Sequence, residues 1–87
     1  MTPIMKSMSY EPSLVSKQIK TTYKVEFNSY IYEIDEYYNS NKELIADSVS
    51  VDGTPIATAN LAIRKMLFNF IKDRRFYIWL NNNLVYI

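Results

Sequence analysis

The sequence of 87 residues predicts one α+β domain with the element order β-β-β-α-β-β. Three features support this. Apolar and polar side chains alternate through residues 23–35, an amphipathic stripe runs through 56–70, and two short apolar segments flank the asparagines at 81–83. A chain of this length is too short to divide into two cores. We therefore expect a three-stranded antiparallel meander, one helix and a closing hairpin.

The middle of the chain predicts three strands. Residues 23–27 and 30–35 alternate with the period of half-buried strands, and Asn28 and Ser29 separate them. After a loop at 39–41, the segment 44–51 predicts a third strand, because its final valines favour β structure. Ser40 and Glu43 also fit a capping box, so a helix over 41–48 is the alternative.

The first residues show no period. Residues 1–11 are therefore expected to form a mobile leader, and residues 12–87 to form the single domain. Pro12 suits the first turn of a helix, which predicts a short helix from there to about Lys20.

The most regular pattern in the chain is that of a long helix. Asp52 and Gly53 indicate a turn, after which Thr54 suits the N-cap and Pro55 the first helical position. One apolar stripe follows at three- and four-residue spacing: Ile56, Ala59, Ile63, Met66, Leu67 and Phe70. Leu61 and Phe68 lie off this stripe, so they are expected either to fill a second buried face or to contact a partner.

The end of the chain predicts a β-hairpin, with strands at 76–80 and 84–87. Both strands are apolar on both faces, so they are expected either to form the fully buried centre of a sheet or to contact the helix with one face and another molecule with the other. We expect three aromatic side chains to form that protein interface: Tyr77, Trp79 and Tyr86. The last strand is also a candidate edge for pairing with a second copy.

The composition excludes several kinds of chemistry. The chain has no cysteine and no histidine, so disulfides, the usual zinc sites and catalytic triads cannot form, and its single glycine excludes phosphate-binding loops. We expect no catalytic residues, no metal and no cofactor. The segment 25–52 carries seven acidic residues and one lysine. This segment is expected either to be solvated and to pair with the basic helix within the fold, or to present an acidic face to a basic partner at three of these residues: Glu33, Asp35 and Glu36.

These observations predict a non-enzymatic protein–protein interaction module that also forms a homo-oligomer. Ile, Asn, Tyr and Lys, whose codons are AT-rich, supply 33 of the 87 residues, which points to an AT-rich genome such as that of a phage, a plasmid or a low-GC bacterium. We expect a small phage or mobile-element protein that binds and inhibits a host factor. No secretory signal or apolar span is visible, so we expect a cytoplasmic protein without a membrane partner. The alternative is a nucleic-acid-binding domain that uses a basic helix: Arg64, Lys65, Lys72, Arg74 and Arg75.

Overall fold

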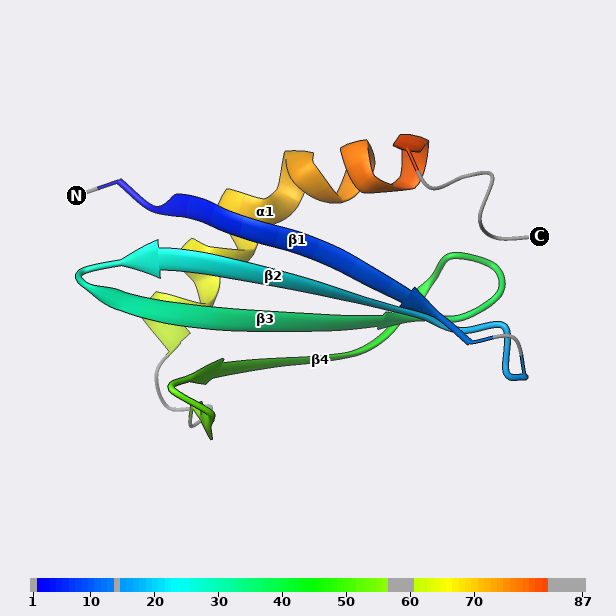
Figure 1. Cartoon of the computed structure of the whole chain (residues 1–87), viewed down its shortest axis with the longest axis horizontal. Helices are drawn as coiled ribbons and strands as arrows, with labels where there is room; N and C mark the ends of the chain where they lie inside the picture. Colours follow the sequence, from blue (N-terminus) through cyan, green and yellow to red (C-terminus); the bar gives the residue numbers. More distant parts are fainter. Residues whose placement is uncertain (1, 14, 57–60, 82–87) are drawn as a thin grey trace.

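In the residues that the structure describes, the fold is one antiparallel sheet of five strands followed by one helix (Figure 1). The computed structural model describes residues 2–13, 15–56 and 61–81. In chain order the elements are β1 (Ile4–Pro12), β2 (Ile19–Phe27), β3 (Tyr30–Tyr38), β4 (Leu44–Val51), β5 (Thr54–Pro55) and α1 (Leu61–Asn81). The spatial order of the strands is the order of the chain. The predicted order β-β-β-α-β-β is therefore wrong: all five strands precede the helix.

The three strands expected in the middle of the chain are present as β2, β3 and β4. Asn28 and Ser29, with φ of 52° and 67°, turn β2 into β3. Positive φ at both central residues is what a two-residue type I′ hairpin requires. The segment 44–51 is a strand throughout, so the alternative helix over 41–48 does not form.

The expected leader and N-terminal helix are replaced by β1, which pairs with β2. The register shifts between Met5 and Ser7, because Lys6 is an extra residue on the β1 side. This bulge breaks the two-residue period, which is why the sequence shows no alternation here. Pro12 ends β1 instead of opening a helix, and a turn closed by Ser13 and Gln18 leads into β2.

The helix begins later than the sequence suggests. Thr54 and Pro55 pair with Val51 and Ser50 as the edge strand β5, where the missing N–H of proline removes no inner ladder bond. The helix α1 then extends through residues 76–80. The first strand of the predicted hairpin is therefore wrong, and its second strand, 84–87, lies outside the described residues.

The core lies between α1 and one face of the sheet. Its fully buried side chains come from the three central strands and from α1: Tyr23, Val25, Ile34, Val49, Leu67 and Ile71. Because side chains alternate along a strand, the intervening residues lie on the opposite face, which we call the open face. From β2, β3 and β4 it carries Lys20, Thr22, Lys24, Glu26, Ile31, Glu33, Asp35, Tyr37, Ala46, Ser48 and Ser50.

Candidate functional site

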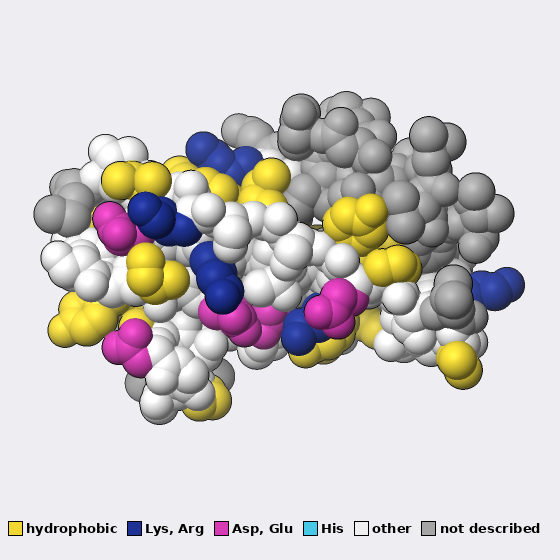
Figure 2. All heavy atoms as spheres, viewed as in Figure 1, with side chains coloured by type: hydrophobic (Ala, Val, Ile, Leu, Met, Phe, Trp, Pro, Cys, Tyr) yellow, Lys and Arg dark blue, Asp and Glu magenta, His cyan; other side chains and the backbone are white. Residues whose placement is uncertain are grey.

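Charged side chains of both signs gather over the strands on the open face (Figure 2). The register explains the arrangement: Lys24 of β2 stands opposite Glu33 of β3, and Thr22 stands opposite Asp35. On the other side of β3, Ser50 faces Glu33 and Ser48 faces Asp35. The carboxylates of β3 therefore lie between a strand bearing lysines and a strand bearing small hydroxyl side chains.

Asp35 is the more enclosed of the two carboxylates, with only 8% of its surface exposed. The Thr22 hydroxyl donates a 2.8 Å hydrogen bond to Asp35 Oδ1. A buried carboxylate needs such donors, because water no longer solvates its charge. This hydrogen bond fixes the orientation of the Asp35 side chain on the sheet.

Glu33 titrates abnormally because of its surroundings. Partial removal from water raises the pKa of the Glu33 carboxyl above its ordinary value, and the charge of Asp35 and a hydrogen bond with Asp35 raise it further. Lys24 and Lys20 act in the opposite direction without cancelling these effects. The raised pKa of Glu33 therefore reflects its partial burial first and its closeness to Asp35 second.

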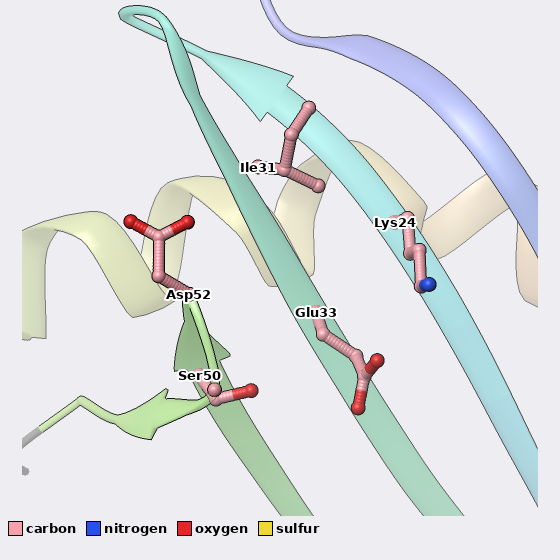
Figure 3. Close-up of a pocket in the computed structure, with 6 residues that line it drawn as sticks. Lys24, Ile31, Glu33, Ser50 and Asp52 are labelled. Carbon is pink, nitrogen blue, oxygen red and sulfur yellow. The ribbon is translucent and has the colours of Figure 1, made fainter.

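A shallow hollow of about 240 Å³ lies beside this pair. Its lining comes from three strands and the β4–β5 turn: Lys24, Ile31, Glu33, Ser50, Asp52 and Gly53. In Figure 3 the Glu33, Lys24 and Ser50 side chains project from neighbouring strands on the same side of the sheet. The hollow therefore offers two carboxylates, one ammonium group and an apolar wall at Ile31.

The structure separates Glu36 from the other two residues of the expected acidic face. Strand alternation turns Glu36 to the helix side, where it is fully buried and its Oε1 accepts a 2.9 Å hydrogen bond from the Tyr38 hydroxyl. Glu33 and Asp35 do share the open face. The acidic pair of the open face is therefore Glu33 and Asp35.

The basic residues of α1 are partly engaged within the chain. Arg64 Nη2 lies 3.0 Å from Asp47 Oδ1, and the Arg64 guanidinium lies 5.6 Å from the Phe68 ring. Arg74 donates a hydrogen bond to the Phe70 carbonyl oxygen and stacks 4.0 Å from the Phe70 ring. Lys65 and Lys72 are exposed, and the side chain of Arg75 lies outside the described part. These contacts leave Lys65 and Lys72 as the exposed cations among the described side chains of this set.

The expected aromatic interface does not form as a β-strand. Tyr77 and Trp79 lie in α1, with side chains outside the described part of the chain, and Tyr86 lies outside the described residues. Of the two residues off the helical stripe, Leu61 is 68% exposed, whereas Phe68 packs against the core. Leu61 and Phe68 therefore do not form one exposed ridge.

Several residues of the site were missed from the sequence: Thr22, Ser48 and Ser50 of the open face, and Asp52 of the β4–β5 turn. Ser48 and Ser50 alternate with Val49 and Val51, which indicates a strand but gives no sign that the serines adjoin carboxylates. That neighbourhood depends on the register between β3 and β4. The three-dimensional structure is needed to see that register, because the local sequence pattern does not specify which residues of β3 and β4 lie opposite each other.

Comparisons with known proteins give no further information about the site. No protein-family model, curated protein or solved structure matches this chain. Among the described residues, no group of three or more Asp or Glu side chains could hold a metal ion. The described helix is not long and apolar enough to cross a membrane.

Proposed function

We propose that this chain is a non-enzymatic module that binds another protein through the open face of its sheet. The supporting observation is that α1 covers one face of the sheet, while the other face presents the pair Glu33 and Asp35 beside a hollow. Two carboxylates on one face of the same strand, Glu33 and Asp35, favour a partner with basic groups.

The composition supports a particular setting for this binding. The excess of residues with AT-rich codons suits a chain encoded by an AT-rich genome, such as that of a phage, a plasmid or a low-GC bacterium. The proposal is that the chain is a small phage or mobile-element protein that acts in the cytoplasm by binding and inhibiting a host protein. Catalysis has little support, because histidine and cysteine are absent from the sequence and Asp35 is engaged with Thr22.

The second candidate, nucleic-acid binding by the basic helix, receives less support. Phosphate binding depends on cations that can leave their intramolecular contacts. Arg64 is bonded to Asp47, and Arg74 is bonded to the backbone and stacked on Phe70. Lys65 and Lys72 are the exposed members of this set that the structure describes.

Self-association is a further part of the proposal, resting on the aromatic residues of the last segment. Sedimentation equilibrium of the whole chain measures it directly. We expect a dimer that dissociates when Trp79→Ala is introduced and persists when Tyr30→Ala, at the exposed first residue of β3, is introduced instead. A monomer at every concentration would remove self-association from the proposal without affecting the binding of another protein.

The proposed function is tested by capture from a lysate of a low-GC bacterium. The tagged chain is immobilised, the lysate is divided into nuclease-treated and untreated halves, and bound proteins are identified by mass spectrometry. We expect one protein to remain after nuclease treatment and to be lost with the double variant Glu33→Gln, Asp35→Asn. The matched control is Glu11→Gln, which removes one carboxylate near the end of β1.

The same experiment can contradict the proposal. If all captured material disappears with nuclease, the nucleic-acid alternative replaces protein binding. If the captured protein is retained equally by the double variant and by the control, the open face is not the binding surface.

A further inference from the structure

One edge of the sheet is only partly paired. The strand β5 has two residues and pairs with Ser50 and Val51 of β4, after which the Ile56 N–H donates a 2.8 Å hydrogen bond to the Val49 carbonyl oxygen. Among the described residues, no strand pairs with the outer side of residues 44–48. We call this outer side the β4 edge.

The backbone of the β4 edge is oriented for pairing. The Val49 carbonyl points away from β3, because it accepts its hydrogen bond from Ile56. In an antiparallel ladder, residues two apart direct their N–H and C=O groups to the same side. Asp47 therefore directs its backbone donor and acceptor outward, toward the position of an added strand.

The two edges of the sheet differ in their suitability for an added strand. At β1, proline lies at positions 3 and 12, Lys6 forms a bulge, and Figure 1 shows α1 crossing behind β1 and projecting past it. Proline, lysine and bulges are the features that discourage pairing at a sheet edge. Residues 44–48 contain neither proline nor lysine, and their one irregularity is at Ile45, the second residue of β4, which leaves Ala46, Asp47 and Ser48 in regular register with β3.

The side chains of β4 on the open face are small, which leaves space for long, positively charged side chains of an added strand. On the open face β4 presents only small side chains, at Ala46, Ser48 and Ser50. A strand added to this edge would lie about 10 Å from β3, which is two strand spacings. A lysine or arginine on that strand would cross only a small side chain before reaching the carboxylates of Glu33 and Asp35.

We propose that the β4 edge binds an extended, basic segment of a partner protein as an additional antiparallel strand. The segment's lysine or arginine side chains lie across Ser48 and Ser50 and pair with Glu33 and Asp35. Leu44 and Ile45, which are 44% and 50% exposed, give it apolar contacts at the far end of the edge. This inference rests on the proposed function and names the chemistry of its partner.

The probe is a labelled nonapeptide of alternating arginine and threonine, because threonine favours extended structure. Its affinity is measured by fluorescence anisotropy, and its position by hydrogen exchange of backbone amides. We expect binding that slows exchange of the Asp47 amide. Replacing every arginine by glutamate, or N-methylating alternate amides while keeping the charges, should weaken binding about tenfold or more, which corresponds to about 1.4 kcal/mol.

Protein variants separate the β4 edge from general charge attraction. Ser48→Arg places a competing cation beside Asp35 and should weaken peptide binding about tenfold. The matched control is Ser16→Arg in the exposed turn between β1 and β2, which adds the same charge away from the strand positions of Glu33 and Asp35 and should leave binding unchanged. Circular dichroism of both variants tests whether the sheet is intact. Glu33→Gln, which removes one carboxylate of the proposed site with a smaller structural change, is a second variant for the same peptide-binding measurement.

Other outcomes overturn the inference. One is that the wild type binds the N-methylated and the unmodified peptide with equal affinity. Another is that the Ser48→Arg variant and the wild type bind the unmodified peptide with equal affinity. The third is that the peptide slows amide exchange only in β1. If the protein captured from lysate binds Ser48→Arg as well as it binds the wild type, the edge inference fails while the proposed function stands. If the wild type captures no protein, the proposed function fails whatever the peptide does.

Discussion

Ile34 shows what one core residue contributes. It is fully buried at the centre of β3, with Tyr23 and Val49 beside it on the neighbouring strands. We expect Ile34→Ala to lower the free energy of unfolding by about 2–5 kcal/mol, through lost burial and a cavity. Urea denaturation measures the loss. The control Ile31→Ala, on the exposed side of the same strand, should lower the free energy of unfolding by less. An equal decrease for both variants would contradict the assignment of faces.

Glu33 makes stability depend on pH. Its pKa is raised in the folded chain, so at neutral pH the fold carries an ionised carboxyl that it disfavours. We therefore expect Glu33→Gln to be more stable than the wild type near pH 7. The difference should narrow as pH falls through the raised pKa, because folded Glu33 then takes up a proton before the unfolded chain does. Urea midpoints over a pH series measure it, and a difference that widens toward acid would contradict the sign.

The turn between β2 and β3 contains a backbone conformation that lowers the stability of the fold, and one substitution can relieve it. Ser29 has φ of 67°, a left-handed conformation that disfavours any residue with a Cβ. We expect Ser29→Gly to stabilise the fold by about 0.5–1 kcal/mol, the cost of the conformation less the entropy that glycine loses on folding. Thermal unfolding checks the gain. Ser29→Ala retains a Cβ at the left-handed position and should give no such stabilisation. An equal increase in stability from alanine would contradict this explanation.

The helix α1 is tied to β4 by the ion pair of Arg64 and Asp47. Both side chains are partly exposed, so their coupling should be modest. A double-mutant cycle with Arg64→Ala and Asp47→Ala should give about 0.2–1 kcal/mol. Added salt should reduce the coupling. Strict additivity of the two substitutions would show that the pair contributes nothing; Lys65→Ala, on the exposed side of α1, is the control.

The elements differ in how much of them the sequence could predict. The strands β2, β3 and β4 follow from alternation, since each has one face in the core. The strand β1 does not, because the Lys6 bulge places Met5, Met8 and Tyr10 on the helix side with unequal spacing. Pro55 fits a helix start and a sheet edge equally well. The apolar segment 76–80 has no period that distinguishes strand from helix.

The candidate site was predicted in part for the same reasons. Alternation was enough to place Glu33 and Asp35 together, and it also turns Glu36 to the other side. The contributions of Ser48, Ser50 and Asp52 depend on pairing between strands that are distant in the sequence. Such pairing depends on register, which no local pattern specifies.

At the scale of the whole molecule, β1 is part of the folded unit. It pairs with β2 over most of its length, and Met5 packs against the core. Removal of residues 1–12 should expose the outer backbone of β2 and abolish or strongly weaken cooperative urea unfolding. Removal of residues 1–3 alone, which precede β1, should leave the urea midpoint unchanged. An unchanged midpoint after the longer truncation would mean that β1 adds nothing to stability.

The order of the elements also has a consequence for biosynthesis. Each strand pairs with the one made just before it, so the meander can assemble while the ribosome is still translating. The helix that covers Tyr23, Ile34 and Val49 is translated after all five strands. A nascent sheet therefore exposes its apolar side until α1 is released, and during that interval we expect it to bind chaperones that recognise exposed apolar surface.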